Sequence, residues 1–303
     1  MRSRVCAGSS NDLFFLDTAP SFIIGRSILN KEVLYSWFFS FFLMSSITSA
    51  GTTWGWMTLF PRERVVPLFS ANPTAPQFSV GQIFENRNVS ASMGALFPMI
   101  DLQWDGFKAQ FSVGSSVYAY LNPPEKVNLI STDFFIDFIV IDIPLSEDWA
   151  LRIAPGHTSH HLSDNAYAQS GLSKPIDYVR DYWEVFGIYR SAMLKGFIYG
   201  GAFYAYTHLI DKETHKPWML EIGGEFLQTP VIENIVAYAA ADLKFRQEAK
   251  YSTTQNYQIG LRFLNSSGFS LRLAYNHRAG VDERGQCIPR HARWNMLSVY
   301  LDV

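Results

Sequence analysis

The stretch FKAQFSVGSSVYAYL, residues 107–121, decides the fold, because its side chains alternate between two kinds. The odd-numbered positions are apolar apart from one serine, and the even-numbered positions are polar, small or tyrosine. Successive residues of a β-strand point to opposite faces, so this segment has one apolar and one polar face. A helix would repeat its apolar positions at a period of ~3.6 residues, which this stretch does not do. Residues 107–121 are therefore predicted to form a long strand.

The same alternation continues from residue 77 to the C-terminus and predicts an all-β protein. It is clear in IVAYAAADLKF, residues 235–245, and in FSLRLAYN, residues 269–276. No helical period of comparable length competes with it in this part of the chain. We expect about twelve strands, at residues 77–84, 88–97, 107–120, 132–142, 149–158, 178–190, 196–208, 217–226, 235–246, 255–264, 268–277 and 293–303.

Strand length and loop length favour a membrane barrel over a soluble one. Many of the expected strands run for ~10 residues or more, enough to cross a bilayer at a tilt, whereas soluble strands cluster near ~5–6 residues. The connections on one side are mostly long and those on the other mostly short, as in outer-membrane barrels. The long set is 121–131, 159–177, 209–216, 247–254 and 278–292, and the short set is 98–106, 143–148, 191–195, 227–234 and 265–267.

Aromatic residues gather near the ends of the expected strands, as at Phe107, Trp149, Trp218 and Tyr300. Membrane interfaces favour such rings, although strands favour them in any setting. Strands in hydrocarbon have to close into a ring, because each unpaired backbone group costs several kcal/mol there. The predicted fold class is therefore all-β, a transmembrane antiparallel β-barrel of about twelve strands. A soluble periplasmic ligand-binding β-protein, with the apolar face as its core, is the alternative.

The composition excludes several classes of protein. Charged residues make up 17% of the chain and aromatic residues 16%, with a formal net charge of −2 and a mean hydropathy of +0.00. An apolar content of 48% can bury a core, which excludes a disordered chain. The lack of a basic surplus excludes a nucleic-acid binder by bulk charge. The two cysteines, Cys6 and Cys287, make no zinc motif or disulfide framework, and no metal or cofactor is expected.

The N-terminal part has the features of a leader. The apolar run VLYSWFFSFFLM, residues 33–44, follows Arg26 and Lys31 and precedes small residues that end at Ala50. That order is typical of a secretory signal peptide, and a buried core helix is the alternative. The predicted organisation is an N-terminal extension and signal peptide at 1–50, a proline-containing periplasmic connector at 51–76 and the barrel at 77–303. An exported barrel is expected in the outer membrane of a Gram-negative cell, with outer-membrane lipid, the barrel-insertion machinery and small solutes as partners.

Three short blocks resemble a known bacterial family. The first is PLFSANP at residues 67–73, continued by PQFS at residues 76–79. The second and most specific is GHTSHHLSD at residues 156–164, and the third is YVRDY at residues 178–182. The blocks resemble those of the family called domain of unknown function 1207. That family is similar to outer-membrane barrels and has no settled activity, so the resemblance implies a fold and a location but no reaction.

The block at residues 156–164 also holds the candidate catalytic pair. His157 and Ser159 lie two residues apart on an expected strand and share a face with Leu151 and Ile153, which the barrel would turn toward lipid. A serine beside a histidine base at the lipid-facing rim would suit an outer-leaflet lipid (lipid A) hydrolase. The pair is similar to the His-x-Ser pair of lipid A deacylases. No orienting carboxylate can be assigned from the sequence.

The same block allows two other hypotheses. His160, His161 and Asp164 would hydrogen-bond the loop at 159–177 onto the barrel, and this structural role is the one that the sequence favours. Metal binding by His157, His160 and His161 is the third hypothesis, but no further ligand cluster accompanies them.

Charged residues on the polar face of the strands are the other candidate site. Facing the lumen, they would form either a constriction that selects small solutes by charge or a salt-bridge network that plugs a narrow barrel. The leading functional hypothesis is a structural or pore-type barrel with functional outer loops, which is not an enzyme. The candidates are Lys108, Glu221, Glu225, Asp242, Lys244, Arg262 and Arg272.

Overall fold

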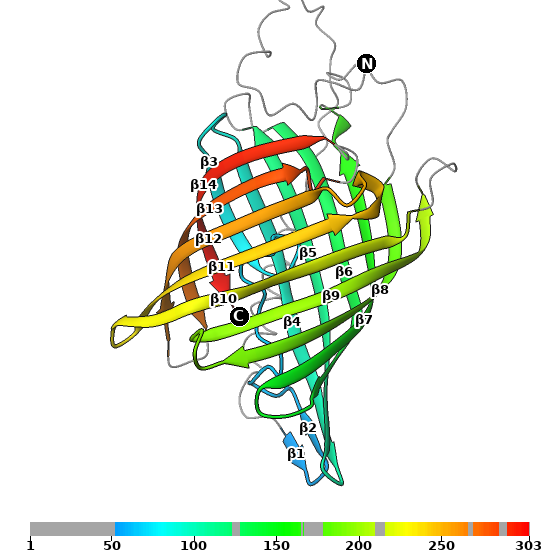
Figure 1. The fold of residues 1–303 in the computed structure, drawn as a ribbon, viewed down its shortest axis with the longest axis vertical. Coiled ribbons are helices and arrows are strands. Elements are labelled where there is room, and N and C mark those ends of the chain that lie inside the picture. Colours follow the sequence, from blue (N-terminus) through cyan, green and yellow to red (C-terminus); the bar gives the residue numbers. More distant parts are fainter. Residues whose placement is uncertain are drawn as a thin grey trace, which may run out of the picture.

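The computed structural model describes residues 52–122, 128–164, 166, 178–209, 216–265, 269–284 and 290–302. Twelve strands, β3 to β14, pair with their neighbours in antiparallel fashion, and β4 closes the ring by pairing with both β3 and β5 (Figure 1). Two short strands, β1 and β2, extend the sheet at one end of β4. Among the described residues, no helix is long and apolar enough to cross a membrane. The strands are β1 Thr52–Trp54, β2 Met57–Leu59, β3 Phe78–Ile83, β4 Val89–Trp104, β5 Phe107–Asn122, β6 Asn128–Pro144, β7 Trp149–Leu162, β8 Tyr178–Ser191, β9 Gly196–Leu209, β10 Trp218–Ile232, β11 Ile235–Arg246, β12 Thr253–Leu264, β13 Ser270–Val281 and β14 His291–Asp302.

All twelve predicted strands are present, and several are longer than predicted, with the largest extensions at the C-terminal ends of β4 and β10. β4 runs on to Trp104, because a β-bulge near Pro98 shifts its register without ending it. The turn that follows is only Asp105 and Gly106, whose φ angles of 45° and 80° are those that a tight hairpin requires. β10 likewise runs to Ile232 through two bulges, where the alternation predicts a turn. In both strands the bulge interrupts the period of two on which the prediction depends.

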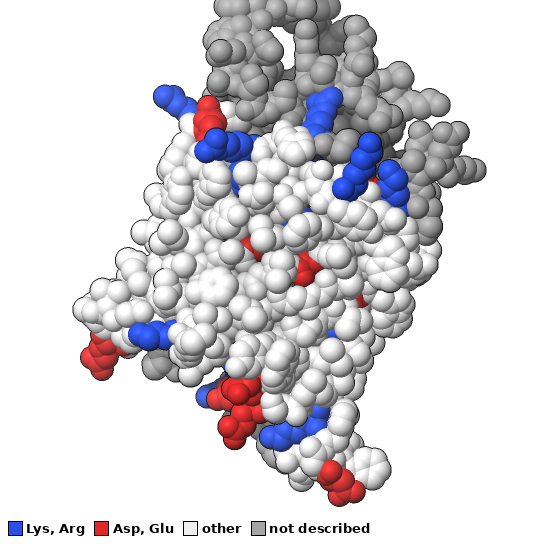
Figure 2. Space-filling model, in the orientation of Figure 1, with Lys and Arg blue, Asp and Glu red and all other residues white. Residues whose placement is uncertain are grey.

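The two faces of the strands differ in polarity in the sense expected of a membrane barrel. On β12, Ile259 is 66% exposed on the outside, whereas its neighbour Gln258 is 2% exposed and faces the lumen. In Figure 2 charged side chains gather toward the two ends of the molecule, and the broad band between the ends shows few of them. A soluble barrel would have its apolar face inside, so that alternative does not fit. The chain forms a closed transmembrane antiparallel β-barrel, as predicted.

The two ends of the barrel differ in their connections. We call the end that holds the short connections 105–106, 145–148, 192–195 and 233–234 the turn end, which lies toward the bottom of Figure 1. The opposite end, where β7 is joined to β8 through residues 163–177, is the loop end. Long and short connections are thus segregated as predicted. The predicted signal peptide at residues 1–50 lies outside the described residues.

Residues 61–77 lie inside the barrel, and we call them the plug. The sequence predicts residues 61–76 as part of a periplasmic connector and residue 77 as the start of the first strand. Within the plug, Val66 is 0% and Phe69 5% exposed. The plug reaches opposite walls, since the backbone N–H of Val65 donates to Gln110 of β5 at 3.1 Å and Asn72 donates to Glu221 of β10 at 2.9 Å. The segment has no periodicity of its own, and its position depends on closure of the ring around it.

Candidate functional site

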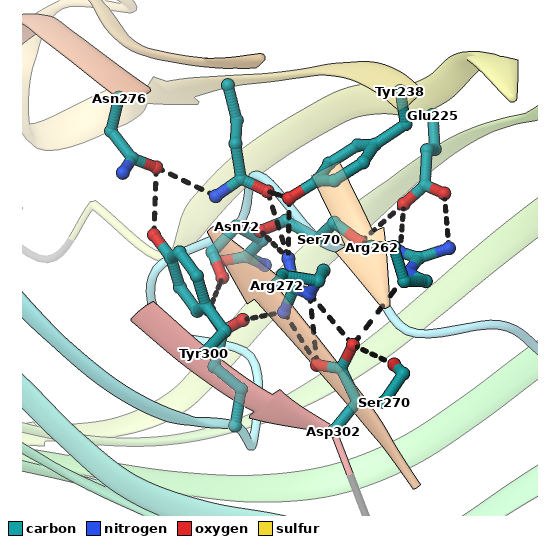
Figure 3. A network of polar contacts seen from close by, with 12 residues as sticks. Ser70, Asn72, Glu225, Tyr238, Arg262, Ser270, Arg272, Asn276, Tyr300 and Asp302 are labelled. Atoms are coloured by element: carbon teal, nitrogen blue, oxygen red, sulfur yellow. Dashed lines mark hydrogen bonds and ion pairs between the residues drawn. The ribbon is translucent and has the colours of Figure 1, made fainter. Parts of the chain in front are cut away.

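The buried cation Arg272 is the centre of the first polar network between wall and plug (Figure 3). Its guanidinium donates to Asp302 at 2.8 Å, to Gln258 at 2.9 Å and to Gln77 of the plug at 2.9 Å. The guanidinium carbon also lies 4.4 Å from the ring centroid of Tyr300. A buried charge is stable only when its hydrogen-bonding groups have partners, and Arg272, at 0% exposure, meets that condition.

A bidentate ion pair adjoins this network. Arg262 of β12 and Glu225 of β10 form two contacts of 2.8 Å on the inner face of the wall. Ser70 of the plug joins both partners, since its hydroxyl donates to Glu225 and accepts from Arg262 at 3.1 Å (Figure 3). The plug is therefore hydrogen-bonded to a charge pair of the wall.

The amine of Lys244 is the centre of the second network. It donates to Asn72 at 2.9 Å, to Thr74 at 3.0 Å and to Glu283 at 3.1 Å. The side-chain amide of Asn72 in turn donates to Glu221. The neutral amide of Asn72 thus donates to the carboxyl group of Glu221 and accepts from the amine of Lys244. An Asn side chain can make both bonds because it has a donor and an acceptor.

An aromatic contact holds the plug against three strands. The ring of Phe69 stacks on Tyr199 with centroids 3.7 Å apart and meets the edge of Phe186 at 5.4 Å. The guanidinium of Arg152 lies 5.4 Å from the same ring. These partners stand on β9, β8 and β7 respectively. Offset aromatic contacts add to the stability from burial, so Phe69 is the main apolar anchor of the plug.

The plug separates two spaces inside the barrel. The space on the turn-end side measures about 400 Å³ and is lined by Leu68 of the plug together with Arg190, Gln228 and Asp302 of the wall. A space on the loop-end side, lined in part by Thr74, measures about 10 Å³, room for about one water molecule. A small solute would fit the first space but not the second.

Six of the seven predicted lumen charges lie in these networks: Glu221, Glu225, Asp242, Lys244, Arg262 and Arg272. The seventh, Lys108, is exposed at the turn end, two residues beyond the hairpin turn. The expectation that Lys108 faces the lumen does not fit this position. Parity along a strand predicts which face a residue takes, but not whether that part of the strand encloses the lumen. A binding role for the six stays a prediction.

A separate polar cluster lies on the outer face near the loop end, and we call it the polar row. His157 of β7, Asp181 of β8 and Thr207 of β9 are direct cross-strand neighbours. Nδ1 of His157 lies 2.6 Å from Oδ1 of Asp181, and the hydroxyl of Thr207 donates to Oδ2. The His157 and Asp181 side chains are 27% and 33% exposed. One carboxylate thus orients the histidine ring and leaves the other ring nitrogen, Nε2, for another partner.

Ser159 shares the outward face of β7 with His157. The residues that alternate with them, Thr158 and His160, are buried toward the lumen and bond to each other at 3.0 Å. Ser159 itself is 8% exposed. In the part of the chain that the structure describes, its hydroxyl has no hydrogen-bond partner. The structure therefore brings Ser159, His157 and Asp181 to one face of adjacent strands.

The other residues of this block do not converge on a common point. His160 lies 3.0 Å from Asp133 on the inner side of the wall, whereas His161 is on the outside with its ring against Phe134. Asp164 is exposed. Among the described residues no cluster of histidines, cysteines and carboxylates is arranged to hold a metal ion. The contact of His160 joins β7 to β6 within the wall, and the predicted bonding of the loop at 159–177 onto the barrel stays a prediction.

Sequence reasoning missed Asp181 and Thr207. Asp181 belongs to the block at residues 178–182, but the register that brings it beside His157 is set by pairing across the connection 163–177. Thr207 depends on a further pairing and on a bulge beside Asp181. The usable signal was a carboxylate on the next expected strand, within the third of the blocks that resemble the family.

Comparison with solved structures finds barrels of bacterial outer membranes. The outer membrane phospholipase A from Escherichia coli is 12% identical, with 75% of this chain and 96% of that chain covered and a TM-score of 0.48. The Salmonella typhi outer membrane phospholipase dimer with bound calcium is also 12% identical, with 75% and 90% covered and a TM-score of 0.48. The translocator domain of the autotransporter NalP from Neisseria meningitidis is 10% identical, with 89% and 95% covered and a TM-score of 0.38. These likenesses concern the fold alone.

A comparison with curated proteins finds no match. A family model, by contrast, matches residues 53–297, a range that includes the plug, the polar row and most of the barrel. Because that match covers most of the chain, the protein belongs to the family described as protein of unknown function DUF1207.

Proposed function

We propose that this protein is a serine hydrolase of the Gram-negative outer membrane whose reacting groups face outward from the barrel. The observation that carries the proposal is the 2.6 Å contact between His157 Nδ1 and Asp181 Oδ1, on the face that Ser159 shares. A serine, a histidine base and a carboxylate that orients the base are the groups that acyl transfer requires. Asp181 supplies the orienting group that the sequence pattern left unassigned, and the proposal therefore departs from the non-catalytic role that the sequence favours.

On this proposal, each group of the polar row takes part in one step of ester hydrolysis. The Nδ1–H of His157 donates to Asp181, so the lone pair is on Nε2 and accepts the proton of Ser159. Oγ of Ser159 then attacks the ester carbonyl, the alcohol departs with that proton, and the acyl group stays on the serine. Water, losing a proton to the same Nε2, cleaves the acyl-serine to the free acid and restores Ser159. Thr207, by its bond to the second oxygen, holds Asp181 in place.

The spacing of serine and histidine permits this chemistry. Residues two apart on a strand are about 6.6 Å apart along the chain, so rotation of the two side chains brings Ser159 Oγ to His157 Nε2. Catalytic hydrogen bonds are often long or unformed in free enzymes and tighten when substrate binds.

Hydrolysis of a soluble chromogenic ester by the detergent-solubilised protein tests the proposal. We expect Ser159→Ala to lower turnover on the order of 10³-fold or more, with unchanged heat-modifiable migration on a denaturing gel. Ser115→Ala is the matched control, because Ser115 is an exposed serine on the same level, with Ile136 paired to both Ser115 and His157. Equal turnover by wild type and Ser159→Ala would contradict the proposal.

Passage of small solutes is a second proposal, favoured by the space of about 400 Å³ on the turn-end side of the plug. A pore requires the plug to leave the lumen, because Ser70 and Asn72 are bonded to the wall. On this proposal the wild-type protein is silent in planar bilayers, and a Phe69→Ala/Asn72→Ala double variant conducts. Silence of both would support a purely structural role of the lumen. Outer-membrane lipid and the barrel-insertion machinery stay predicted partners.

A further inference from the structure

The polar row has a row of aromatic residues on its turn-end side. Trp183, Tyr204 and Trp218 are cross-strand neighbours on β8, β9 and β10, and their exposed fractions are 50%, 41% and 43%. The rings of Tyr204 and Trp218 lie 4.9 Å apart. Amphipathic rings on the outer face of a membrane barrel mark the boundary between hydrocarbon and head groups. We call these three residues the aromatic row.

The outer face becomes aliphatic beyond the aromatic row. Val185 of β8 and Leu220 and Ile222 of β10 are 45%, 46% and 52% exposed. On β8 to β10, the outer surface therefore changes from aliphatic to aromatic to polar toward the loop end. Asp181 and Trp183 are two residues apart on β8, which places the polar row within about 7 Å of the aromatic row.

Placing the carboxylate of Asp181 on the membrane-facing surface costs free energy, which an uncharged structural contact at the same position would not. An aspartate at the centre of a bilayer costs ~2.5–3.5 kcal/mol, and an ionisable residue within a membrane segment is by default a hypothesis for a functional site. Asp181 lies at the edge of the apolar band, where that cost is smaller, and one third of its side chain is exposed. Asp181 therefore lies where its side chain can act on a molecule at the membrane interface.

We infer that the substrate is a fatty-acyl ester of a membrane lipid in the leaflet around the loop end, an inference that rests on the proposed function. The ester carbonyls of a lipid lie between its chains and its head group, which is the level of the polar row. The acyl chain extends past the aromatic row into the aliphatic band, and the head group stays at the loop end. Cleavage breaks the ester C–O bond and releases a fatty acid and the lipid alcohol. Glycerophospholipids and lipid A both carry such esters.

Reconstitution into two kinds of vesicle tests this inference and distinguishes the two sources of the ester. One kind contains phosphatidylethanolamine and phosphatidylglycerol, and the other contains the same lipids with lipopolysaccharide. Free fatty acid is measured by mass spectrometry, and the soluble ester is assayed in parallel. We expect fatty acid release by wild type and none by Ser159→Ala. Release from both kinds with intact lipopolysaccharide identifies the phospholipid, and deacylated lipopolysaccharide identifies lipid A.

Trp183→Ala tests the contribution of the aromatic row. We expect its KM for vesicle lipid to rise about 10-fold, equivalent to ~1.4 kcal/mol of lost binding, while turnover of the soluble ester is unchanged. Trp149→Ala is the matched control, because Trp149 is also 50% exposed but lies at the turn end of β7. We expect it to change neither activity.

The possible failures are distinguishable. Cleavage of the soluble ester that depends on Ser159, without fatty acid release from either vesicle, would overturn the lipid inference and leave the serine hydrolase in place. An equal rise in KM for Trp183→Ala and Trp149→Ala would also overturn it, because the aromatic row would then have no special position. Absence of cleavage of any ester would remove the proposed function itself.

Discussion

Two aspartates of this barrel, Asp302 in the lumen and Asp181 on the outer face, have very different neighbours. Asp302 accepts three bonds from the buried guanidinium of Arg272 and one from Ser270 at 2.9 Å. Asp181 accepts one bond from His157 and one from Thr207. The partner of Asp302 has a fixed charge and a full set of contacts, whereas His157 can exchange a proton and has a ring nitrogen to spare.

This difference indicates that the lumen networks and the polar row have different roles. Buried pairs such as Arg272 and Asp302 are strongly destabilised when one member is removed, whatever they contribute as a pair. They hold the plug and the wall in a single arrangement. The polar row contributes little burial, and its value lies in the orientation of His157. On our proposal, the lumen networks hold the plug against the wall, and the polar row on the outer face carries the chemistry.

The largest effect that we predict is the difference in ester hydrolysis between variants of the two aspartates. Asp181→Asn keeps the size of the side chain but no longer favours the correct tautomer of His157, so kcat/KM for the soluble ester should fall on the order of 10⁴-fold. Asp302→Asn is the control and should lower stability without changing turnover by the folded protein. Similar losses of turnover in both variants would show that the two regions are not separable.

The next effect concerns the stability of the lumen. Arg272→Ala removes the closer of the two cations that pair with Asp302 and leaves Arg262 at 3.8 Å. We expect a loss of up to about 5 kcal/mol in the free energy of unfolding. Arg293→Ala is the control, since Arg293 of β14 is exposed, and it should change stability by less than about 0.5 kcal/mol. Urea unfolding in micelles, followed by tryptophan fluorescence, measures both. Equal shifts would mean that the Arg272 network is not structural.

The plug anchor should show a somewhat smaller effect. Phe69→Ala removes the ring that contacts Tyr199 and Phe186 and should cost about 3 kcal/mol. We expect the plug to become accessible to protease while turnover per folded molecule stays the same. A parallel loss of turnover would contradict the independence of the two regions, because Phe69 packs on the inner side of the strands that carry the polar row.

Lys108 gives the smallest expected effect. Lys108→Gln should change the free energy of unfolding by less than about 0.5 kcal/mol, because Lys108 is exposed. Lys244→Gln should cost ~3 kcal/mol or more, because Lys244 is 1% exposed and pairs with the acids Asp242 and Glu283. Thermal unfolding of the two variants side by side measures the contrast. A larger shift for Lys108→Gln would reverse our placement of these lysines.

The barrel itself could be predicted from the sequence, because the alternation of polar and apolar residues along each strand indicates which residues face the lumen and which face outward. The alternation in residues 235–245 places Asp242 and Lys244 on the inner face correctly. Strand ends were harder, since the bulges near Pro98 and in β10 interrupt the period while the hydrogen bonding continues. Lys108 was misplaced for a related reason: parity says nothing about height along the barrel.

The candidate site could be predicted only in part. His157 and Ser159 share a strand, so their common face follows from spacing alone. Asp181 and Thr207 lie on other strands, and their contact with His157 depends on the register of two pairings. The plug could not be predicted, because residues 61–77 have no period and become a structure only inside a closed ring.

Covalent labelling tests most directly the claim that the reactive group faces outward while the lumen is sealed. The solubilised protein is treated with a fluorophosphonate, which reacts with activated serines, and the labelled peptide is identified by mass spectrometry. Our account predicts a single adduct on Ser159 that is absent from the Asp181→Asn variant, and no adduct on Ser70 inside the barrel. An adduct on Ser70, or an unlabelled Ser159 in protein that is folded by its migration on a gel, would contradict it.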